Sequence, residues 1–320
     1  MMHWLAELDG QRVTVEVPAT SANLGAGYDT LGMALSMVNR VEIEVHGWSR
    51  GAVELTVEGE GAGELPATRE NRVVRGIEAA LRQVRGEMPS GAGWGITMRN
   101  EIPLARGLGS SAAATVAGLV AGNVLLGEPL TPNELIRLAT EIEGHPDNAA
   151  AALLGGFVVS AMIDETVEAL RFDVPRDLRA VLFIPERRLE TAAMRRVLPA
   201  KVPRSDAVSN VVRVALGVAG LASGRHEVLR LLTVDRLHEP YRAAAYPELP
   251  RLVEAARSAG ALGACLSGAG STVIAFADTI ASIAVVEAAF AAVAADVDLP
   301  GRVTVVSPRN QGAVVVRQAG

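Results

Sequence analysis

A glycine–serine segment stands directly before one of the two most apolar stretches of the chain. Gly107, Gly109, Ser110 and Ser111 are followed by small, mostly apolar residues as far as position 126. Such a run predicts a buried helix, and glycines let the preceding backbone approach a ligand closely. A helix start offers unpaired N–H groups and the positive end of the helix dipole. The segment is therefore suited to phosphate groups, although an ordinary helix after a glycine loop has the same pattern.

The glycine pattern differs from two familiar nucleotide-binding loops. No lysine follows these glycines, as one does in the loop G-x-x-x-x-G-K-[ST]. The spacing of the dinucleotide fingerprint and its following acidic residue are absent as well. The two serine hydroxyls add neutral hydrogen-bond donors and a candidate ligand for Mg²⁺.

Three further segments combine glycines or small residues with polar side chains. Residues 18–35 surround Asn23 and Asp29 with glycines after a predicted strand, which is typical of a ligand-binding loop or an irregular turn into a helix. Residues 263–276 form a second glycine–serine turn between predicted strands. Residues 139–156 gather side chains that can bind Mg²⁺ and orient a polar substrate, namely Glu141, Glu143, His145, Asp147 and Asn148.

Composition excludes several classes of protein. Of 320 residues, 49% are hydrophobic and 21% are charged, which favours a large folded core. Aromatic residues make up only 3%, the net charge is −6 and Lys201 is the only lysine, so neither nucleic acid nor an anionic membrane is an expected partner. The single cysteine, Cys265, rules out an internal disulfide or a cysteine-based metal cluster.

The N-terminus lacks the basic and apolar regions of a secretory signal, and the apolar runs at 112–126 and 282–297 fall short of the roughly 20 residues that span a bilayer. We therefore expect a cytoplasmic location.

Periodicity predicts a mixture of strands and helices without regular alternation. The predicted strands are 12–17, 40–48, 52–61, 93–102, 155–163, 179–185, 264–277 with its turn, and two short ones after 301. The predicted helices are 71–84, the run up to 126, 131–144, 207–224, 247–260 and 279–297. Short turns between the early strands favour antiparallel pairing and an α+β fold. The charged, proline-broken segment 164–178 suggests domains at 1–164 and 165–320.

Taken in order, these segments resemble the GHMP family of small-molecule kinases. The resemblance rests on PLARGLGSSAA at 103–113 and CLSGAGST at 265–272. Four further motifs resemble the branch of that family that acts on L-homoserine: PATSANLGAGYDTLG (18–32), EGHPDNAAAALLGG (143–156), TAAMRRVLP (191–199) and LHEPYR (237–242).

The resemblance implies a two-domain GHMP kinase fold. Its N-terminal lobe would resemble domain 2 of ribosomal protein S5, and its C-terminal lobe would be a ferredoxin-like α/β lobe. It also implies binding of ATP and Mg²⁺ between the lobes and transfer of a phosphoryl group to the side-chain hydroxyl of L-homoserine. The product would be O-phospho-L-homoserine, an intermediate of threonine biosynthesis. Relatives are often dimers, so a homodimer is expected by analogy alone.

Nucleotide and metal positions carry over from the same family motifs. Ser111 and Glu141 match the Mg²⁺ ligands, with Glu143 as the alternative to Glu141. Positions implied to contact the nucleotide are Asn71 near the adenine, Pro103, Leu104, Ala105, Arg106, Gly107, Leu108, Gly109, Ser110, Ser111, Ala112 and Ala113 in the phosphate loop, and Gly268 and Gly270 behind it.

Acceptor positions carry over in the same way. The matched residues are Asn23, Asp29, His145, Asn148, Arg195 and Arg242, with Thr191 close to the reacting centre. A zwitterion needs an anion for its ammonium group and cations for its carboxylate, and Asp29 and the two arginines provide these. Asp147, Asn148, Thr191 and Arg195 are the expected catalytic residues.

Some points stay open at this level. Asp147 is the candidate general base, but phosphoryl transfer by alignment alone needs none, and His145 suits a neutral donor as well as a base. A mevalonate-like or sugar-like alcohol is the alternative acceptor. A catalytically inactive ATP-binding regulatory protein is the other alternative.

Overall fold

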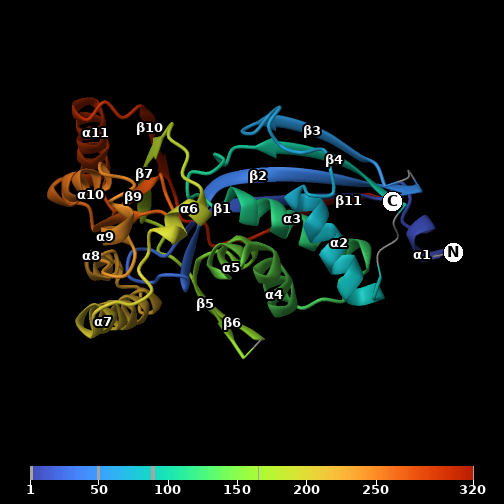
Figure 1. Cartoon of the computed structure of the whole chain (residues 1–320), viewed down its shortest axis with the longest axis horizontal. Coiled ribbons are helices and arrows are strands. Elements are labelled where there is room, and N and C mark those ends of the chain that lie inside the picture. The colour runs from blue at the N-terminus through green and yellow to red at the C-terminus, as the bar shows by residue number, and fades with distance from the viewer. Residues whose placement is uncertain (1–2, 49–50, 88–90, 165, 320) are drawn as a thin grey trace.

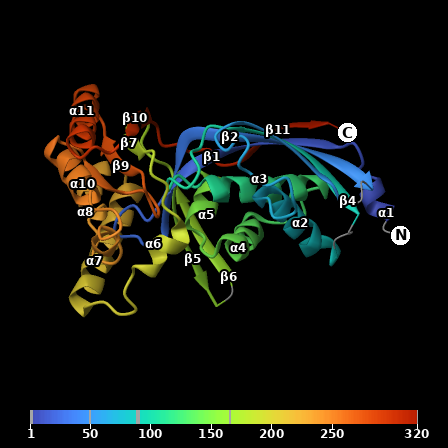
Figure 2. The same cartoon turned by 45° about the horizontal axis from the view of Figure 1, so that its top comes forward.

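The computed structural model describes residues 3–48, 51–87, 91–164 and 166–319. They form two lobes side by side, each with one sheet and its own helices (Figure 1). Both chain ends lie on the N-terminal lobe, at the end away from the C-terminal lobe (Figures 1 and 2). This arrangement matches the two-domain α+β fold that the sequence predicts.

The N-terminal lobe is built on a seven-stranded sheet, in which β11, β1, β2, β4 and β3 lie side by side in that order and β5 and β6 extend it beyond β2. Its strands are β1 (Arg12–Ala22), β2 (Leu31–Trp48), β3 (Val53–Gly59), β4 (Ala92–Asn100), β5 (Phe157–Ile163), β6 (Thr166–Phe172) and β11 (Val314–Ala319). Among the described residues β3 and β4 are the one parallel pair of this sheet, and helix α2 connects them.

The helices of this lobe cover one face of the sheet (Figure 2). They are α2 (Arg72–Arg85), α3 (Ser110–Leu125), α4 (Pro132–Glu143) and α5 (Asp147–Leu154); the short α1 (His3–Ala6) lies near the N-terminus. Helix α3 is buried along almost its whole length, which explains its apolar sequence. Its Gly118 lies against the backbone of α2, where a Cβ atom would come within 2.0 Å of the Val73 oxygen.

The C-terminal lobe contains a four-stranded antiparallel sheet in the order β10, β7, β9, β8. Its strands are β7 (Arg179–Pro185), β8 (Gly263–Leu266), β9 (Val273–Ala277) and β10 (Gly301–Val306). The helices are α6 (Thr191–Arg196), α7 (Arg204–Ala222), α8 (Leu229–Leu232), α9 (Glu239–Arg242), α10 (Leu249–Ser258) and α11 (Ile280–Asp296), with a 3₁₀ turn η1 (His226–Val228). Chain order and strand order together are ferredoxin-like, as expected.

The expected boundary at 164/165 is wrong. It falls inside a hairpin, because β6 pairs with β5 along its whole length and belongs to the first sheet. The last strand, β11, also returns to that sheet and pairs with β1. The charges in β6 suggested a linker, but they lie on an exposed strand in which Val167 is the buried residue.

The segment after the first predicted strand is a hairpin. Strand β1 continues to Ala22, and β2 begins at Leu31 rather than near position 40. Between them, Asn23 and Asp29 adopt positive φ angles of 67° and 54°. Asn and Asp tolerate this conformation better than most residues, which suits them to a tight loop at the lobe boundary.

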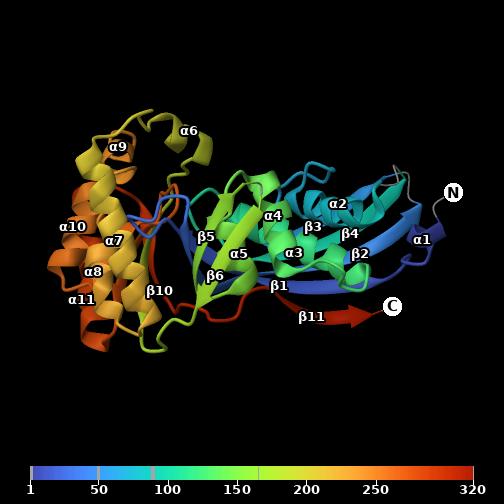
Figure 3. The ribbon, with the colours of Figure 1, turned by 90° about the horizontal axis from the view of Figure 1, so that it is seen from below.

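Among the described residues, α7 is the one helix with the length and composition of a membrane span. It carries Arg204, Asp206 and Arg213 and lies along the outside of the C-terminal lobe (Figure 3). Two of its glycines, Gly217 and Gly220, pack against Leu232 and Val228. In this fold α7 is therefore a surface helix of the lobe.

Candidate active site

A cavity of about 420 Å³ opens where the two lobes meet. The N-terminal lobe contributes the β1–β2 loop, the segment before α3, and the starts of α3 and α5. The C-terminal lobe contributes α6, α9 and the turn after β8. The sequence segments singled out for their chemistry are therefore brought to one place, although Asn23 and Gly268, for example, are 245 residues apart.

Backbone groups form one side of the cavity. Gly107 and Gly109 adopt left-handed conformations with φ of 74° and 71°. Gly109 is the N-cap of α3 and supplies no side chain to cap the helix. The N–H groups of the first turn, at Ser110, Ser111 and Ala112, therefore have no side-chain cap, and all three residues line the cavity. The combination of free amides and helix dipole suits a polyanion.

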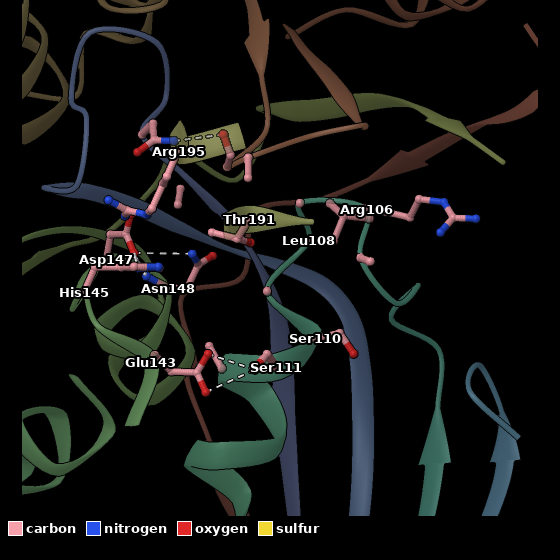
Figure 4. A pocket seen from close by; sticks show the side chains of 18 of the residues that line it. Arg106, Leu108, Ser110, Ser111, Glu143, His145, Asp147, Asn148, Thr191 and Arg195 are labelled. Atoms are coloured by element: carbon pink, nitrogen blue, oxygen red, sulfur yellow. Dashed lines mark hydrogen bonds and ion pairs between the residues drawn. The ribbon is translucent and has the colours of Figure 1, made fainter. Parts of the chain in front are cut away.

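The turn after β8 braces this loop from the other lobe. The Ser267 hydroxyl donates to the Gly107 oxygen at 2.7 Å, and the Thr272 N–H donates to the Arg106 oxygen at 3.0 Å. A Cβ atom on Gly107 would lie 2.1 Å from the backbone carbonyl oxygen of Ser267. Arg106 points away from the other labelled side chains and binds the oxygens of Pro185 and Glu186 (Figure 4).

Glu143 and Ser111 form a hard-oxygen cluster at the start of α3. The Ser111 hydroxyl lies 2.8 and 3.1 Å from the two carboxylate oxygens of Glu143, and Thr115 donates to Glu143 Oε1 at 2.7 Å (Figure 4). Arg72 lies 3.4 Å from the same carboxylate. One carboxylate beside a hydroxyl, next to a phosphate site, is a donor set that suits Mg²⁺.

The position of Glu141 does not support the preference for it as metal ligand. Glu141 lies on the exposed side of α4, pairs with Arg137 one turn earlier, and does not line the cavity. Glu143 lines it and contacts Ser111. The two glutamates differ by two positions on a helix and therefore point in nearly opposite directions.

His145, Asp147 and Asn148 lie together at the start of α5. Asp147 is buried, and its Oδ1 lies 2.6 Å from His145 Nδ1 and accepts the Asn148 N–H at 2.7 Å. Burial lowers the pKa of His145, but the hydrogen bond and charge of Asp147 raise it by more, so the net shift is upward. The Asn148 side chain is oriented by the Thr20 hydroxyl, which donates to Asn148 Oδ1 at 2.8 Å.

Asp29 and Arg195 face each other across the lobe boundary. The guanidinium donates to both carboxylate oxygens, at 2.6 and 2.9 Å, and to the Tyr28 hydroxyl at 2.9 Å. Asn23 fixes the loop, because it accepts the Asp29 N–H at 3.0 Å and donates to the Gly268 oxygen at 2.9 Å. The two opposite charges expected to bind a zwitterion are thus in direct contact with each other.

Arg242 is the second arginine expected to bind the acceptor, and it is only 2% exposed. Within the described part of the chain, no carboxylate lies within ion-pair distance of it; its Nη1 donates to the Gly268 oxygen at 2.9 Å. Burial lowers its pKa, as expected of a guanidinium that has lost water without gaining a carboxylate. An anionic ligand group would supply that missing charge.

Comparisons with known proteins agree with this architecture. The family model "GHMP kinases N terminal domain" matches residues 71–156, and "GHMP kinases C terminal" matches residues 218–295. A homoserine kinase of Moorella thermoacetica is 45% identical over 94% of this chain and 99% of its own. One from Carboxydothermus hydrogenoformans is 47% identical, covering 83% of this chain and 85% of its own.

This chain belongs to the GHMP kinase family. A crystal structure of homoserine kinase from Cytophaga hutchinsonii superimposes with a TM-score of 0.83 at 30% identity, covering 95% of this chain and 97% of its own. The family fold and the phosphotransferase class predicted from the motifs are thus confirmed.

Most positions carried over from the GHMP kinase motifs do line the cavity. The lining residues among them are Asn23, Asp29, Pro103, Ala105, Arg106, Gly107, Leu108, Gly109, Ser110, Ser111, Ala112, His145, Asp147, Asn148, Thr191, Arg195, Arg242 and Gly268. Thr191 begins α6, a helix of six residues that periodicity did not predict.

Besides Glu141, four carried-over residues do not line it. Asn71 is buried and caps α2 by accepting the Val73 N–H, while its amide donates to the Pro66 oxygen. Ala113 is buried in the core, Leu104 lies outside the lining, and Gly270 lies behind Gly107. The expected adenine contact of Asn71 therefore has no support from its position, since its side chain is used as a helix cap.

Some residues of the site were missed. Arg72, Ala22, Ala192 and Ala269 line the cavity, and Thr20 and Tyr28 contact lining residues. For Arg72 the signal was its place in the first turn of the predicted helix 71–84. For Tyr28 it was its place beside Asp29 in a motif already selected.

Proposed function

We propose that this protein transfers the γ-phosphoryl group of ATP to the side-chain hydroxyl of L-homoserine, giving O-phospho-L-homoserine and ADP for threonine biosynthesis. The observation that carries the proposal is one cavity with two chemistries: uncharged backbone donors on one side and paired opposite charges on the other. The similarity to homoserine kinases over most of the chain supports the choice of acceptor.

The phosphate tail of ATP binds the loop before α3. Amide groups of the first turn, at Ser110, Ser111 and Ala112, donate to phosphate oxygens, and the dipole of α3 stabilises the negative charge. Gly107 and Gly109 keep this surface free of side chains. Mg²⁺ would be held by Glu143 and Ser111 together with phosphate oxygens, and it would neutralise charge that develops during transfer.

The acceptor amino acid binds between Asp29 and the two arginines. Its ammonium group pairs with Asp29, and its carboxylate pairs with Arg195 and Arg242. Homoserine must therefore separate Asp29 from Arg195, but it returns one opposite charge to each of them. A neutral alcohol such as a sugar would break the same pair without replacing either partner, which disfavours it.

Transfer proceeds by alignment without a dedicated base. Asp147 is already engaged by His145 and by the Asn148 N–H, and an asparagine accepts no proton at neutral pH. Asn148 and Thr191 orient the acceptor hydroxyl. As its oxygen attacks the γ-phosphorus in line, the bond to the β-phosphate oxygen breaks, and the proton leaves to a phosphoryl oxygen or to water.

An ADP-release assay with a panel of acceptors tests the proposal. L-Homoserine, mevalonate and galactose are offered with ATP and Mg²⁺, and turnover is expected with homoserine alone. Turnover of mevalonate but not homoserine would overturn the choice of acceptor. ATP binding without turnover of any alcohol would instead favour an inactive regulatory protein. We further propose that the enzyme acts in the cytoplasm, where ATP is available.

A further inference from the structure

A buried histidine connects the two ends of the acceptor site, and no role has been assigned to it above. His238 is 0% exposed and stands just before α9, four residues before Arg242. Its Nδ1 lies 3.1 Å from Nη1 of Arg242, and its Nε2 lies 2.8 Å from the backbone oxygen of Gly25. Gly25 belongs to the β1–β2 loop, which carries Asp29. The imidazole therefore bridges the C-terminal lobe and the loop of the N-terminal lobe.

The two contacts fix which nitrogen carries the proton. A guanidinium can only donate, so Nδ1 must offer its lone pair to Arg242. A carbonyl oxygen can only accept, so Nε2 must carry the hydrogen. Burial lowers the pKa of His238 against the raising effect of Asp235, which agrees with a neutral ring. Only this tautomer satisfies both neighbours.

Other groups also fix the position of the His238 ring relative to the β1–β2 loop. Asp235 accepts the backbone N–H of His238 at 2.7 Å. Asn210 donates both to Asp235 at 2.7 Å and to the Ala26 oxygen of the same loop at 2.9 Å. The Tyr28 ring stacks at 5.3 Å from the imidazole and lies 5.6 Å from the Arg242 guanidinium. The imidazole thus has a single position available to it.

We propose that His238 is a positioning residue for the acceptor's carboxylate: it holds Arg242 by its Nδ1 and ties that arginine to the loop bearing Asp29 by its Nε2. The distance between Asp29, which binds the ammonium group, and Arg242, which binds the carboxylate, is thereby fixed. This inference rests on the proposed function, because it takes the anionic ligand of Arg242 to be the carboxylate of homoserine.

Two substitutions separate the two contacts. His238→Asn keeps an acceptor where Nδ1 stands and loses the reach to Gly25. His238→Gln keeps a donor where Nε2 stands and loses the acceptor for Arg242. We expect His238→Gln to raise the KM for homoserine about tenfold and His238→Asn about threefold, with the KM for ATP within about twofold of wild type in both.

A second ligand distinguishes positioning from a general structural role. 2-Amino-1,4-butanediol has the ammonium and hydroxyl groups of homoserine but lacks the carboxylate. It is measured as an acceptor or as a competitive inhibitor, and its affinity is expected to be the same for wild type and His238→Gln. His226→Gln, a change at a histidine that pairs with Asp278 outside the cavity, is the matched control and should leave every constant unchanged.

Three results would overturn the proposal: an unchanged KM for homoserine in His238→Gln, equal losses for homoserine and the amino diol, or an equal loss for ATP. Melting temperatures identify a variant that does not fold, in which case His238→Asn alone decides, by the same comparison of the two ligands. If the wild-type protein does not phosphorylate homoserine, the proposed function is refuted rather than this role of His238.

Discussion

The two sides of the cavity bind charge by different means. The phosphate side uses backbone amides, glycines and a helix dipole, and its loop comes from one continuous segment of the N-terminal lobe. The acceptor side uses the ionised side chains of Asp29, Arg195 and Arg242, which come from both lobes. The first site depends on the absence of side chains, whereas the second depends on their exact pairing across the boundary.

Because of this difference, the two sites are sensitive to different kinds of substitution. Truncating a side chain does not remove a backbone donor, but an added Cβ atom can displace it. Charged side chains are removed easily, and each loss leaves its buried neighbours without a partner. Substitutions on one side should therefore affect one substrate more than the other.

Gly107→Ala should have the largest effect, and it should act on ATP. The residue has a φ of 74°, and its new Cβ atom would lie 2.1 Å from the Ser267 oxygen, so the loop must move. We expect kcat/KM for ATP to fall about 100-fold, while the KM for homoserine changes less than about threefold. Steady-state kinetics with each substrate varied in turn measure both constants.

Gly127→Ala is the control for this backbone change. Gly127 has a similar φ of 79°, but its added Cβ atom would have no neighbour within 4 Å. Its kinetics should equal those of wild type. If Gly107→Ala were equally harmless, the close approach of backbone to phosphate would not be the basis of ATP binding.

Arg242→Met should have the next largest effect, on homoserine. The methionine fills the space of the buried side chain but supplies no charge for the carboxylate. Loss of such a buried charged contact costs about 2–5 kcal/mol, so the KM for homoserine should rise at least about 30-fold.

Arg195→Ala should raise the KM for homoserine less than Arg242→Met does, because Arg195 is more exposed and must first leave Asp29. A matching rise in the KM for ATP in either variant would contradict the division between the two sides.

Glu143→Gln tests the metal site between the two sides. The amide is a weaker ligand than the carboxylate, so the Mg²⁺ concentration for half-maximal rate should rise about tenfold. Glu141→Gln is the matched control two residues away and should leave Mg²⁺ dependence within about twofold of wild type. Titrating the rate with Mg²⁺ at saturating ATP separates them; a larger effect in Glu141→Gln would reverse the assignment.

His145→Gln should give the smallest effect, and it concerns stability. The pKa of His145 is raised in the folded protein. Its protonated form therefore stabilises the fold fully at pH values below about 6.5, the pKa of an unperturbed histidine. This stabilisation is lost as the pH rises through the folded-state pKa. Wild type should therefore exceed the variant in melting temperature by more at pH 6 than at pH 9. Thermal melts across this range give the sign directly, and a gap that widened with rising pH would be inconsistent with the Asp147 pairing.

The phosphate side was predictable because its information is local. Glycines followed by a long apolar run indicated the loop and a helix from about position 110, and α3 spans Ser110–Leu125. A helix was likewise predicted from position 131, and α4 begins at Pro132 with Thr131 as its N-cap. Such signals lie within a few residues of one another, so they are read without knowledge of the tertiary fold.

The acceptor side was not predictable from local patterns. Asp29 and Arg195 are far apart in sequence, and helices α6 and α9 have only six and four residues, too few to show periodicity. Family motifs, rather than patterning, indicated these residues. The domain boundary failed for a related reason, since pairing of β11 with β1 joins the two ends of the chain.

Two local signals were available but not used. Glu143 lies four residues after Ala139 and eight after Leu135, on the buried stripe of α4, whereas Glu141 follows Arg137 on the exposed face. Asn71 is the first residue of the predicted helix 71–84, and asparagine is a preferred N-cap. Helical geometry alone would have favoured Glu143 at the cavity and a capping role for Asn71.

Phosphorus-31 NMR of the wild-type reaction tests the central claim most directly. With ATP, Mg²⁺ and L-homoserine, the account predicts that the γ-phosphate signal is replaced by one phosphate monoester, coupled to the protons of the terminal methylene group of the amino acid. ADP should form in equal amount. Release of inorganic phosphate without a monoester, or a monoester formed only when mevalonate replaces homoserine, would contradict the account.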